Sequence, residues 1–378
     1  MTNAVIAGYA RSPFAPARKG GLTRVRPDEM AAEVLRALIA RTGVNPADIE
    51  DIIVGCAFPE AEQGLNVARL IALLADLPIT VAGATVNRFC GSSMYAIHMA
   101  AGAIAMGAGE AFVALGVESM TRVPMGGYNP MPSPALYAKN PAAYMGMGET
   151  AENVAQRWQI TRDAQEEFAL ASHIKAAAAQ KDGRLSGEIV PITLGKANAT
   201  QDECIRHDAS REGLAGLKPA FDANGTVTAG TSSPLTDGAS AVLVCSEDYA
   251  RAHGLAITAR IASVAVAGCA PDIMGIGPVA ASRKAMARAG ISAKDIDVVE
   301  LNEAFASQAL ACMRELDLDG ARVNLDGGAI ALGHPLGATG ARITGKAAQL
   351  LQREGGRYAL ATQCIGGGQG IATVLEAV

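Results

Sequence analysis

The sequence has few aromatic residues and no excess of basic ones. Aromatic side chains make up 4% of its 378 residues, and the formal net charge is -5. A protein that neutralises phosphates needs a basic surplus, so this balance argues against a nucleic-acid partner. Half of the residues are apolar, and Gly and Ala are abundant, which favours closely packed helices over a core filled by bulky rings.

Cysteines are present, but their spacing is not that of a disulfide framework or a zinc site. There are seven, an odd number, and none lies in C-x-x-C spacing. We therefore expect no metal, and most of the thiols to be buried and structural. They are scattered along the chain at Cys56, Cys90, Cys204, Cys245, Cys269, Cys312 and Cys364.

No stretch is apolar enough to predict a membrane span. The most lipid-like segment, residues 94–117, consists mainly of Ala and Gly and contains His98 and Glu110, which predicts a buried helix followed by a strand. The first residues lack a basic start followed by a long apolar run and a cleavage site, so no secretory signal is predicted. We therefore expect a cytoplasmic protein without membrane insertion.

The chain is long enough for two cores and contains an internal repeat. Residues 43–54 match residues 290–301 in pattern, and each copy follows an amphipathic helix and enters a β-branched strand. The repeat predicts two similar α/β halves, residues 1–250 and 256–378. Two later pairs of segments recur in the same order, 85–87 with 322–324 and 111–116 with 358–363.

Helical patterns alternate with short apolar runs, which is typical of strands separated by helices. We expect a layered α/β fold with two sheets. From about residue 119 to 235 the chain carries loops rich in Met, Pro, Gly and Tyr and one polar helix at 163–180. This stretch is too long for a plain connection, so it predicts an insertion in the first half that covers the substrate. Further helices are expected at 28–41, 94–105, 278–289 and 341–354.

Cys90 is the first candidate for catalysis. It lies where a predicted strand meets an Ala-rich helix, so unpaired N–H groups and the helix dipole are expected to lower the pKa of the thiol and prepare a nucleophile. Gly91 is expected to let a substrate carbonyl approach the backbone closely. The alternative is a buried cysteine in a tight turn, since a free thiol usually behaves as a small hydrophobe.

Three further motifs carry candidate groups. His334 lies in a glycine-dense loop without the P-loop or dinucleotide-binding patterns. The glycines leave room for a base beside a bulky ligand, and a structural histidine is the alternative.

Cys364 follows a predicted strand and precedes three glycines. Backbone N–H groups beside the thiol can form an oxyanion hole, and the alternative is a hairpin whose glycines only satisfy the turn. Asn302 ends another predicted strand, either in a site or as a helix cap.

Together, the motifs around Cys90, Asn302, His334 and Cys364 resemble those of the thiolase family, in this order and at these separations. The resemblance covers essentially the whole chain. It implies a five-layered α/β fold of two duplicated halves with an inserted loop domain, and a homodimer or homotetramer. It also implies CoA thioesters as substrates and CoA as a co-substrate, without a permanently bound cofactor.

The resemblance assigns a role to each candidate. Cys90 attacks the 3-keto carbon and holds the shortened acyl chain, and His334 is the base toward Cys90 and toward the incoming CoA thiol. Cys364 is the acid and base at the α-carbon of the acetyl unit. One oxyanion lies at His334 and a water held by Asn302, and the other at the backbone N–H groups of Cys90 and Gly366. A weakly acidic α-proton needs such a base and such preorganised donors.

The same resemblance assigns four residues to the CoA or acyl channel and separates this chain from some members of the family. Gly146 stands where many acetoacetyl-CoA-specific members have His. We therefore expect a degradative thiolase that cleaves 3-ketoacyl-CoA of more than four carbons in fatty-acid β-oxidation. A multienzyme partner in β-oxidation is a further expectation. Arg206 is alternatively a surface charge. The four channel residues are Met147, Arg206, Ser233 and Phe305.

Three alternative functions stay open. An acetoacetyl-CoA thiolase makes or cleaves the four-carbon substrate alone. A decarboxylating condensing enzyme shares the cysteine nucleophile but generally uses a second histidine where this chain has Cys364. A non-catalytic acyl-CoA binder is the third, against which the complete set of candidate residues argues.

Overall fold

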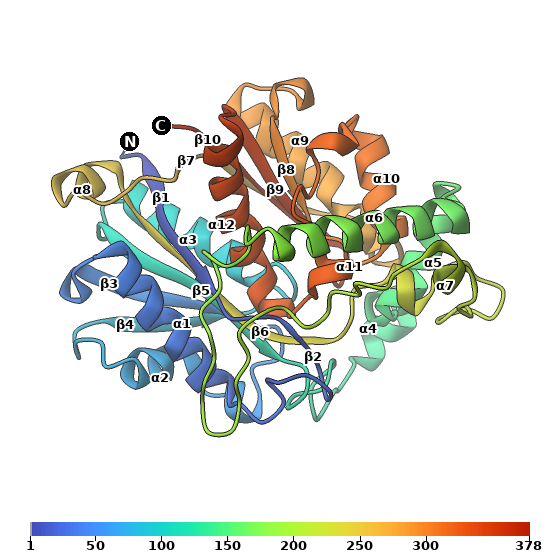
Figure 1. The fold of residues 1–378 in the computed structure, drawn as a ribbon, viewed down its shortest axis with the longest axis horizontal. Helices are drawn as coiled ribbons and strands as arrows, with labels where there is room; N and C mark the ends of the chain where they lie inside the picture. Colours follow the sequence, from blue (N-terminus) through green and yellow to red (C-terminus); the bar gives the residue numbers. More distant parts are fainter. Residues whose placement is uncertain (1) are drawn as a thin grey trace.

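The computed structural model describes residues 2–378. The first half of the fold runs from β1 to α8 (Figure 1). Its strands are β1 (Ala4–Arg11), β2 (Ala15–Pro16), β3 (Ile49–Gly55), β4 (Ala82–Val86), β5 (Ala111–Ser119) and β6 (Thr236–Ser246). Its helices are α1 (Pro27–Thr42), α2 (Val67–Leu74), α3 (Ser92–Ala105), α4 (Pro134–Lys139), α5 (Met147–Arg157), α6 (Arg162–Lys181), α7 (Arg211–Ala215) and α8 (Glu247–Ala252).

The second half repeats part of this order. Its helix α12 begins at Leu336 rather than at the predicted residue 341. Glycine lowers helix propensity, but a Cβ at Gly337 would lie 2.6 Å from the carbonyl oxygen of Val117, so close packing requires glycine in this first turn. The elements are β7 (Ala259–Gly268), β8 (Val298–Leu301), β9 (Tyr358–Ile365), β10 (Gln369–Glu376), α9 (Gly277–Ala289), α10 (Ala306–Leu316), α11 (Ala329–Leu332) and α12 (Leu336–Glu354).

Within the described residues the strands form one ten-stranded mixed sheet, in the order β4-β3-β5-β6-β1-β7-β10-β9-β8 with β2 beside β6. Strands β1 and β7 join the two halves at only two residue pairs, Val5 with Arg260 and Ile6 with Ala259. The prediction of two separate sheets is therefore wrong, because a narrow antiparallel seam connects them.

The internal repeat is confirmed by the topology. The order β3-β5-β6-β1 in one half matches β8-β9-β10-β7 in the other. Gly43 and Gly290 each end a helix in the left-handed region, with φ of 71° and 70°, where glycine carries no Cβ penalty. Each is followed by a single 3-10 turn, Pro46–Asp48 or Ala293–Asp295, and then by β3 or β8.

The helices complete a fold of five layers, as predicted. Helices α3 and α12 lie at the centre and pack on strands of both halves, while α1 and α2 cover the outer face of the first half and α9 that of the second. A Cβ at Gly340 of α12 would lie 2.3 Å from the backbone nitrogen of Met94 in α3. The scarcity of aromatics follows, because these central helices touch backbone to backbone.

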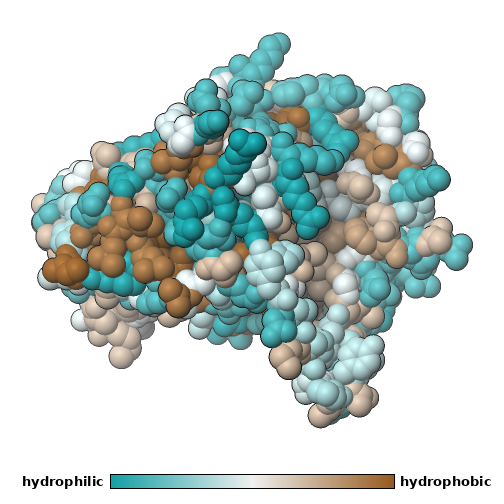
Figure 2. Space-filling view, turned by 90° about the horizontal axis from the view of Figure 1, so that it is seen from below, coloured by the Kyte–Doolittle hydropathy of each residue, from teal (hydrophilic) through white to brown (hydrophobic). Residues whose placement is uncertain are grey.

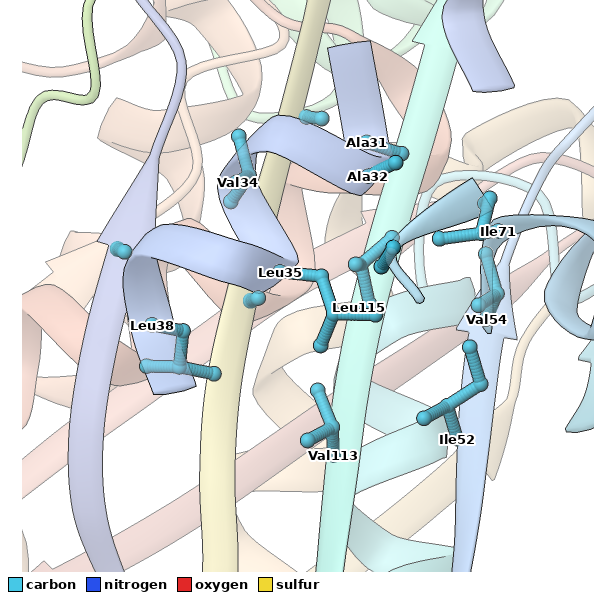
Figure 3. Packing of buried hydrophobic residues seen from close by; sticks show 14 of the residues in the cluster. Ala31, Ala32, Val34, Leu35, Leu38, Ile52, Val54, Ile71, Val113 and Leu115 are labelled. Atoms are coloured by element: carbon cyan, nitrogen blue, oxygen red, sulfur yellow. The ribbon is translucent and has the colours of Figure 1, made fainter. Parts of the chain in front are cut away.

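The outer layer of the first half packs as the sequence pattern predicts. Figure 3 shows Leu35 of α1 pointing toward Leu115 and Val113 of β5, while Leu38, one turn further along α1, lies over β1 and β6. These side chains are fully buried, and each contributes roughly 1.5–3 kcal/mol through the apolar area it removes from water. This layer holds β3, β4 and β5 in place, and their carboxyl ends lead to the site.

The insertion contains α4 to α7. The polar helix predicted at 163–180 is α6, which begins after Thr161, whose hydroxyl accepts a hydrogen bond from the N–H of Ala164 at 3.2 Å. The lipid-like segment 94–117 forms α3 and β5, as predicted. Among residues 2–378, no helix combines the length and the apolar character that crossing a bilayer requires.

Buried ion pairs fasten the insertion to the two halves. Arg11 of β1 binds Asp202 with two hydrogen bonds of 2.6 and 2.8 Å, and it also pairs with Glu188. Lys346 of α12 bridges Glu188 at 3.0 Å and Asp326 at 2.8 Å. Removing one member would leave a charge buried without a partner, which typically costs about 3–5 kcal/mol. The network thus fixes the loop that begins at Asp326 and carries His334.

Candidate active site

Cys90 stands in the short segment between β4 and α3. Phe89 before it has a φ of 44°, in the left-handed region that bulky residues rarely adopt. The hydroxyl of Ser92 supports this bend, since it accepts from the N–H of Arg88 at 2.8 Å and donates to the carbonyl of Phe89 at 2.6 Å. The side chain of Gln363 in β9 donates a hydrogen bond to the Cys90 carbonyl, which ties the segment to the other half.

The Cys90 thiol is neutral at physiological pH. Burial raises its pKa to about 12, although the N–H groups of Gly366 and of Cys90 itself face the sulfur and lower the pKa. The prediction of a lowered pKa is therefore wrong, because desolvation outweighs the donors at the start of the helix. A base must remove the thiol proton before the sulfur can attack.

His334 lies between α11 and α12 on a loop that requires glycine. Gly333 has a φ of 102°, and a Cβ there would lie 2.7 Å from the Thr236 side chain. The N–H of His334 donates to Oγ1 of Thr236 at 3.0 Å. Burial lowers the pKa of the imidazole to about 3, and the charge of Arg342 contributes in the same direction. The ring is therefore neutral and able to accept a proton.

The hydrogen bonds of the ring define which nitrogen is free. Nδ1 of His334 lies 2.7 Å from Oγ1 of Thr339, and this hydroxyl donates its one proton to the carbonyl of Pro335 at 2.9 Å. The hydroxyl thus accepts from Nδ1–H, which leaves the lone pair on Nε2. Nδ2 of Asn302 lies 3.3 Å from Nε2. The ring of His334 is thus held from both sides, with Nε2 as the nitrogen that carries the lone pair.

Asn302 is part of the site and not a helix cap. Helix α10 begins only at Ala306, and the Asn302 amide turns instead to His334. Its Oδ1 is buried and accepts no hydrogen bond from the described residues. Buried polar atoms are normally satisfied, so Oδ1 is an acceptor that a water or a substrate group can use.

Cys364 belongs to β9 itself, opposite Gly370 in the hairpin that β9 forms with β10. Gly367 and Gly368 turn this hairpin with φ of 79° and 85°, so the hairpin interpretation of the glycines is also correct. Burial raises the pKa of the Cys364 thiol well above its ordinary value, and the neighbouring Cys90 raises it further. The thiol is a proton donor at neutral pH.

These groups converge on one place. Cys90 packs in an apolar cluster with Leu336, which follows His334 closely in sequence. Cys90 and Cys364 are near enough to influence each other's charge, and the N–H of Gly366 faces the Cys90 sulfur. The fold thus brings together a neutral thiol, a neutral imidazole, a second thiol and two backbone donors, the parts of an acyl-transfer site.

Comparison with known proteins agrees with this arrangement. Residues 4–248 match the model of the thiolase N-terminal domain, and residues 255–377 match that of the thiolase C-terminal domain. The chain belongs to the thiolase family. It is 48% identical over 387 residues to the 3-ketoacyl-CoA thiolase of Vibrio vulnificus (strain CMCP6), with all of both chains covered. Its identity to the 3-ketoacyl-CoA thiolase of Bacillus subtilis (strain 168) is 45% over 389 residues, again with all of both chains covered.

A solved thiolase-like structure supports the fold. The chain matches the crystal structure of the Bacillus anthracis acetyl-CoA acetyltransferase with a TM-score of 0.92 and 41% identity, covering 100% of this chain and 99% of the other. The predicted fold class is thereby confirmed. These relatives carry two different names, 3-ketoacyl-CoA thiolase and acetyl-CoA acetyltransferase.

Three of the four channel residues predicted from the thiolase resemblance lie at the two thiols. The sulfur of Met147 lies 3.5 Å from the place that a Cβ of Gly366 would occupy. Phe305 packs in one cluster with Cys364, and Ser233 donates through both its N–H and its hydroxyl to the carbonyl of Ala304, the residue before Phe305. Met147 and Phe305 thus form an apolar flank of the site, and Ser233 holds the backbone beside it.

Arg206, the fourth, does not reach this flank. Its side chain is exposed, and its backbone holds the hydrogen bonds: the N–H donates to Nδ1 of His173 at 3.1 Å, and the carbonyl accepts from the N–H of Ala209 at 3.3 Å. The neighbouring Ile205 packs against Leu332, close to His334 in the chain. Arg206 therefore lies on the surface near the site. This position fits both a residue at the mouth of the CoA channel and an ordinary surface charge.

The glycines of the two thiolase motifs pack the fold instead of making room for a ligand. A Cβ at Gly91 would lie 2.5 Å from Cδ1 of Ile365, and one at Gly328 would lie 2.0 Å from the carboxyl carbon of Glu303. The expectation that Gly91 admits a substrate carbonyl is therefore wrong. The glycines matter because they allow helix starts and strand ends to touch, which draws the reactive side chains together.

Glu118, at the end of β5, is a residue of this site that sequence reasoning missed. Its buried carboxylate accepts from the N–H groups of Ala57 and Gly337 at 2.8 Å each and from Nε2 of Gln63 at 2.9 Å. Burial raises its pKa, and these donors oppose the shift. Glu118 thus fastens the first turn of α12 to the loop after β3. The available signal was a carboxylate ending an otherwise apolar strand.

Proposed function

We propose that this chain cleaves 3-ketoacyl-CoA with CoA, releasing acetyl-CoA and an acyl-CoA shortened by two carbons. The observation that carries the proposal is the placement of Cys90, which packs on a cluster with Leu336 of the His334 loop, faces the N–H of Gly366 and lies near enough to Cys364 for one thiol to affect the pKa of the other. These groups supply a nucleophile, a base and an acid. The 3-ketoacyl-CoA thiolases that match over the full length support the substrate class.

In the first half-reaction, Nε2 of His334 takes the proton of the Cys90 thiol, and the thiolate attacks the 3-keto carbon. The bond between C2 and C3 then breaks, and its electron pair stays on C2 as the enolate of acetyl-CoA. The Cys364 thiol donates its proton to C2, which completes acetyl-CoA and leaves a thiolate. The N–H groups of Cys90 and Gly366 stabilise one oxyanion, and His334 with a water held by Asn302 stabilises the other.

In the second half-reaction, His334 first passes the proton that it took from Cys90 to the Cys364 thiolate, so that His334 and Cys364 are both neutral again. His334 then takes the proton of the CoA thiol, and the CoA thiolate attacks the thioester on Cys90. The bond between the acyl carbon and the Cys90 sulfur breaks, and the leaving thiolate takes its proton back from His334. Atoms and protons balance, and the site is restored.

Met147, Ser233 and Phe305 bind the CoA-bearing part of the substrate in this account, and Arg206 contributes at the surface. The apolar flank that Met147 and Phe305 form beside Cys364, with Ser233 bonded to the carbonyl of Ala304, supports this assignment. The alternative of an acetoacetyl-CoA thiolase draws support from the acetyl-CoA acetyltransferase structure. A condensing enzyme and a mere acyl-CoA binder are less well supported, because this chain carries the second thiol and the complete set of reactive groups.

A homo-oligomer, a homodimer or a homotetramer, is part of the proposal. Strand β4 ends the sheet path, so one of its edges is open for pairing with another strand. Figure 2 shows a hydrophobic area on the left of the face it displays, the side on which α2 lies in Figure 1. Exposed apolar side chains near α2 and β4 are Leu65, Leu70, Leu73, Leu74 and Ile79. Patches of this kind mark association surfaces.

Other parts of the account stay predictions. We propose the division into residues 1–250, with the insertion at about 119–235, and residues 256–378, which agrees with the order of strands on either side of the seam. A role in fatty-acid β-oxidation, a partner in a larger assembly and a cytoplasmic location are expectations of the sequence.

Thiolysis of a series of 3-ketoacyl-CoA esters, from acetoacetyl-CoA upward, tests the proposal. We expect CoA-dependent cleavage at several chain lengths by the native protein and none by Cys90→Ala. Cleavage of acetoacetyl-CoA alone would favour the short-chain alternative. No cleavage at any length by well-folded native protein would refute the enzymatic function.

A further inference from the structure

The two thiols of the site lie in two separate apolar clusters. Cys90 and Phe58 both pack against the buried cluster of Ala57, Met120 and Leu336. Cys364 packs with Phe305 and Ala304, together with Met274 and Met147. The thiols are close in space, yet each faces its own apolar surroundings. A substrate with two arms therefore meets a different flank on each side.

The internal repeat makes these clusters counterparts of each other. Its pattern aligns Val54 with Leu301, and continuing along both copies in step pairs Ala57 with Ala304 and Phe58 with Phe305. Both Ala-Phe pairs follow equivalent strands, β3 and β8. Each half of the molecule thus presents the same pair of side chains to one of the two cysteines.

The second ring in each cluster extends the correspondence. The ring of Phe58 lies 6.0 Å from that of Phe89, centroid to centroid, and the ring of Phe305 lies 5.9 Å from that of Phe221. Phe89 is 39% exposed and Phe221 is 44% exposed. Each flank therefore has an inner phenylalanine and an outer one that reaches solvent. The flanks meet at Gly366, where an added Cβ would lie 3.5 Å from the sulfur of Met147 and 3.7 Å from Cδ2 of Phe89, and they diverge from there along Phe58 and Phe305.

The chemistry of the proposed reaction assigns one arm of the substrate to each flank. The acetyl unit that carries CoA is protonated by Cys364, so its arm lies on the flank of Phe305. The remaining acyl chain is bonded to the Cys90 sulfur. Its tail leaves the shared carbon in the other direction, and the nearest apolar surface on that side is the flank of Phe58 and Phe89.

We propose that Phe58 is a specificity-determining residue that contacts the tail of the acyl group on Cys90 and favours substrates longer than acetoacetyl-CoA. The proposal rests on the thiolase activity proposed above. The backbone of Phe58 is held from both sides, because its N–H donates to Glu118 at 3.3 Å and its carbonyl accepts from Gln63 at 2.9 Å. The half-buried residue thus has a fixed backbone and packs on the same cluster as Cys90, where its ring can bury methylene groups that acetoacetyl-CoA lacks.

The test compares kcat/KM for 3-ketooctanoyl-CoA and acetoacetyl-CoA in the full-length protein. In Phe58→Ala and Phe58→Gln we expect the ratio of the two values to fall about tenfold, because a tail contact worth one or two methylene groups is lost. Phe58→Leu keeps an apolar side chain and is expected to stay within about threefold of the native ratio. Activity toward acetoacetyl-CoA and the thermal midpoint report whether each variant is folded.

The matched control is Phe221→Ala, the outer ring of the other flank. It lies on the CoA side, so both substrates are expected to change by the same factor and the ratio to stay constant. Equal loss for both substrates in Phe58→Ala, or a selective loss of the longer substrate in Phe221→Ala, would overturn the proposal. Native protein that cleaves acetoacetyl-CoA alone would also overturn it while leaving the thiolase chemistry intact. Native protein that cleaves neither ester refutes the activity itself.

Discussion

The side-chain amide of Asn302 lies 3.3 Å from Nε2 of His334, and it meets the nitrogen that Thr339 leaves unprotonated. A neutral donor at this place orients the imidazole without adding a charge. The ring therefore stays neutral, as its burial already dictates. We therefore expect the ring of His334 to be unprotonated, and able to act as a base, throughout the neutral pH range.

Asn302→Asp changes this relationship from neutral to charged. A carboxylate beside Nε2 favours the imidazolium and raises the pKa of His334, so the base is lost as the pH falls through the raised pKa. We expect kcat/KM for thiolysis to fall roughly a hundredfold at pH 7, with a new acid limb in the pH profile. Asn302→Ala, the control, removes the donor without adding charge and is expected to lower activity without the new limb. Identical pH profiles in both variants would contradict the assignment.

The sequence predicted the local setting of the candidate residues better than it predicted their protonation state. Cys90, His334 and Cys364 were visible because each stands beside glycines at a change from one element to the next. The pKa of Cys90 was not predictable, because it depends on burial by residues from the other half, such as Gln363 and Ile365. Local pattern reveals the start of a helix, whereas desolvation depends on contacts far apart in the chain.

The repeat was predictable for the same reason. Gly43 and Gly290 are local signals, each ending a helix in the left-handed region before a strand. The seam between β1 and β7 was not predictable, because two residue pairs leave no periodic mark in the sequence. The early start of α12 was missed because its glycines lower helix propensity, and only their packing against backbone explains them.

Glu118→Gln tests the fastening of α12. Oε2 of Glu118 accepts from the N–H groups of Ala57 and Gly337, and Oε1 accepts from the N–H of Phe58 and from Nε2 of Gln63. A Gln side chain replaces one of these two oxygens by an amide nitrogen, so one of the two pairs of donors loses its acceptor. We expect the free energy of unfolding to fall by about 1–3 kcal/mol, measured by urea denaturation. Removing a negative charge near Cys90 is also expected to lower the pKa of that thiol and speed its alkylation.

Glu152→Gln is the matched control for this variant. Glu152 also accepts from two backbone N–H groups, those of Thr226 and Val227, at 2.9 and 2.8 Å. We expect a similar loss of stability without faster alkylation of Cys90. Equal alkylation rates in Glu118→Gln and the native protein would show that the Glu118 charge does not act on the nucleophile.

Gly333→Ala tests the loop that presents His334. The φ of 102° at this position is unfavourable for alanine, and a Cβ would lie 2.7 Å from Thr236, whose hydroxyl holds the backbone of His334. We expect a loss of about 1–3 kcal/mol of stability together with a large loss of kcat. Gly355→Ala, at the left-handed end of α12 with open space around it, is expected to lose about 1 kcal/mol and to keep its kcat. Normal kcat in Gly333→Ala would contradict the argument.

The pH dependence of Cys90 alkylation follows from its raised pKa. Burial raises the pKa to about 12, so the reactive thiolate is scarce at neutral pH and increases as the pH rises toward that value. We expect the rate of iodoacetamide labelling at Cys90 to rise about tenfold per unit between pH 7 and pH 10. Peptide mass spectrometry measures it residue by residue. A rate that is already constant above pH 7 would mean that the thiolate is stable in the resting site.

The central claim is that Cys90 carries the acyl group, and its most direct test is to trap that group. The native protein is mixed with 3-ketooctanoyl-CoA in the absence of free CoA and quenched, and its peptides are analysed by mass spectrometry. The account predicts a hexanoyl thioester on Cys90, acetyl-CoA released in equal amount, and loss of the thioester on adding CoA. It predicts no adduct in Cys90→Ala. A hexanoyl group on Cys364, or acetyl-CoA release without any acyl-enzyme, would contradict the account.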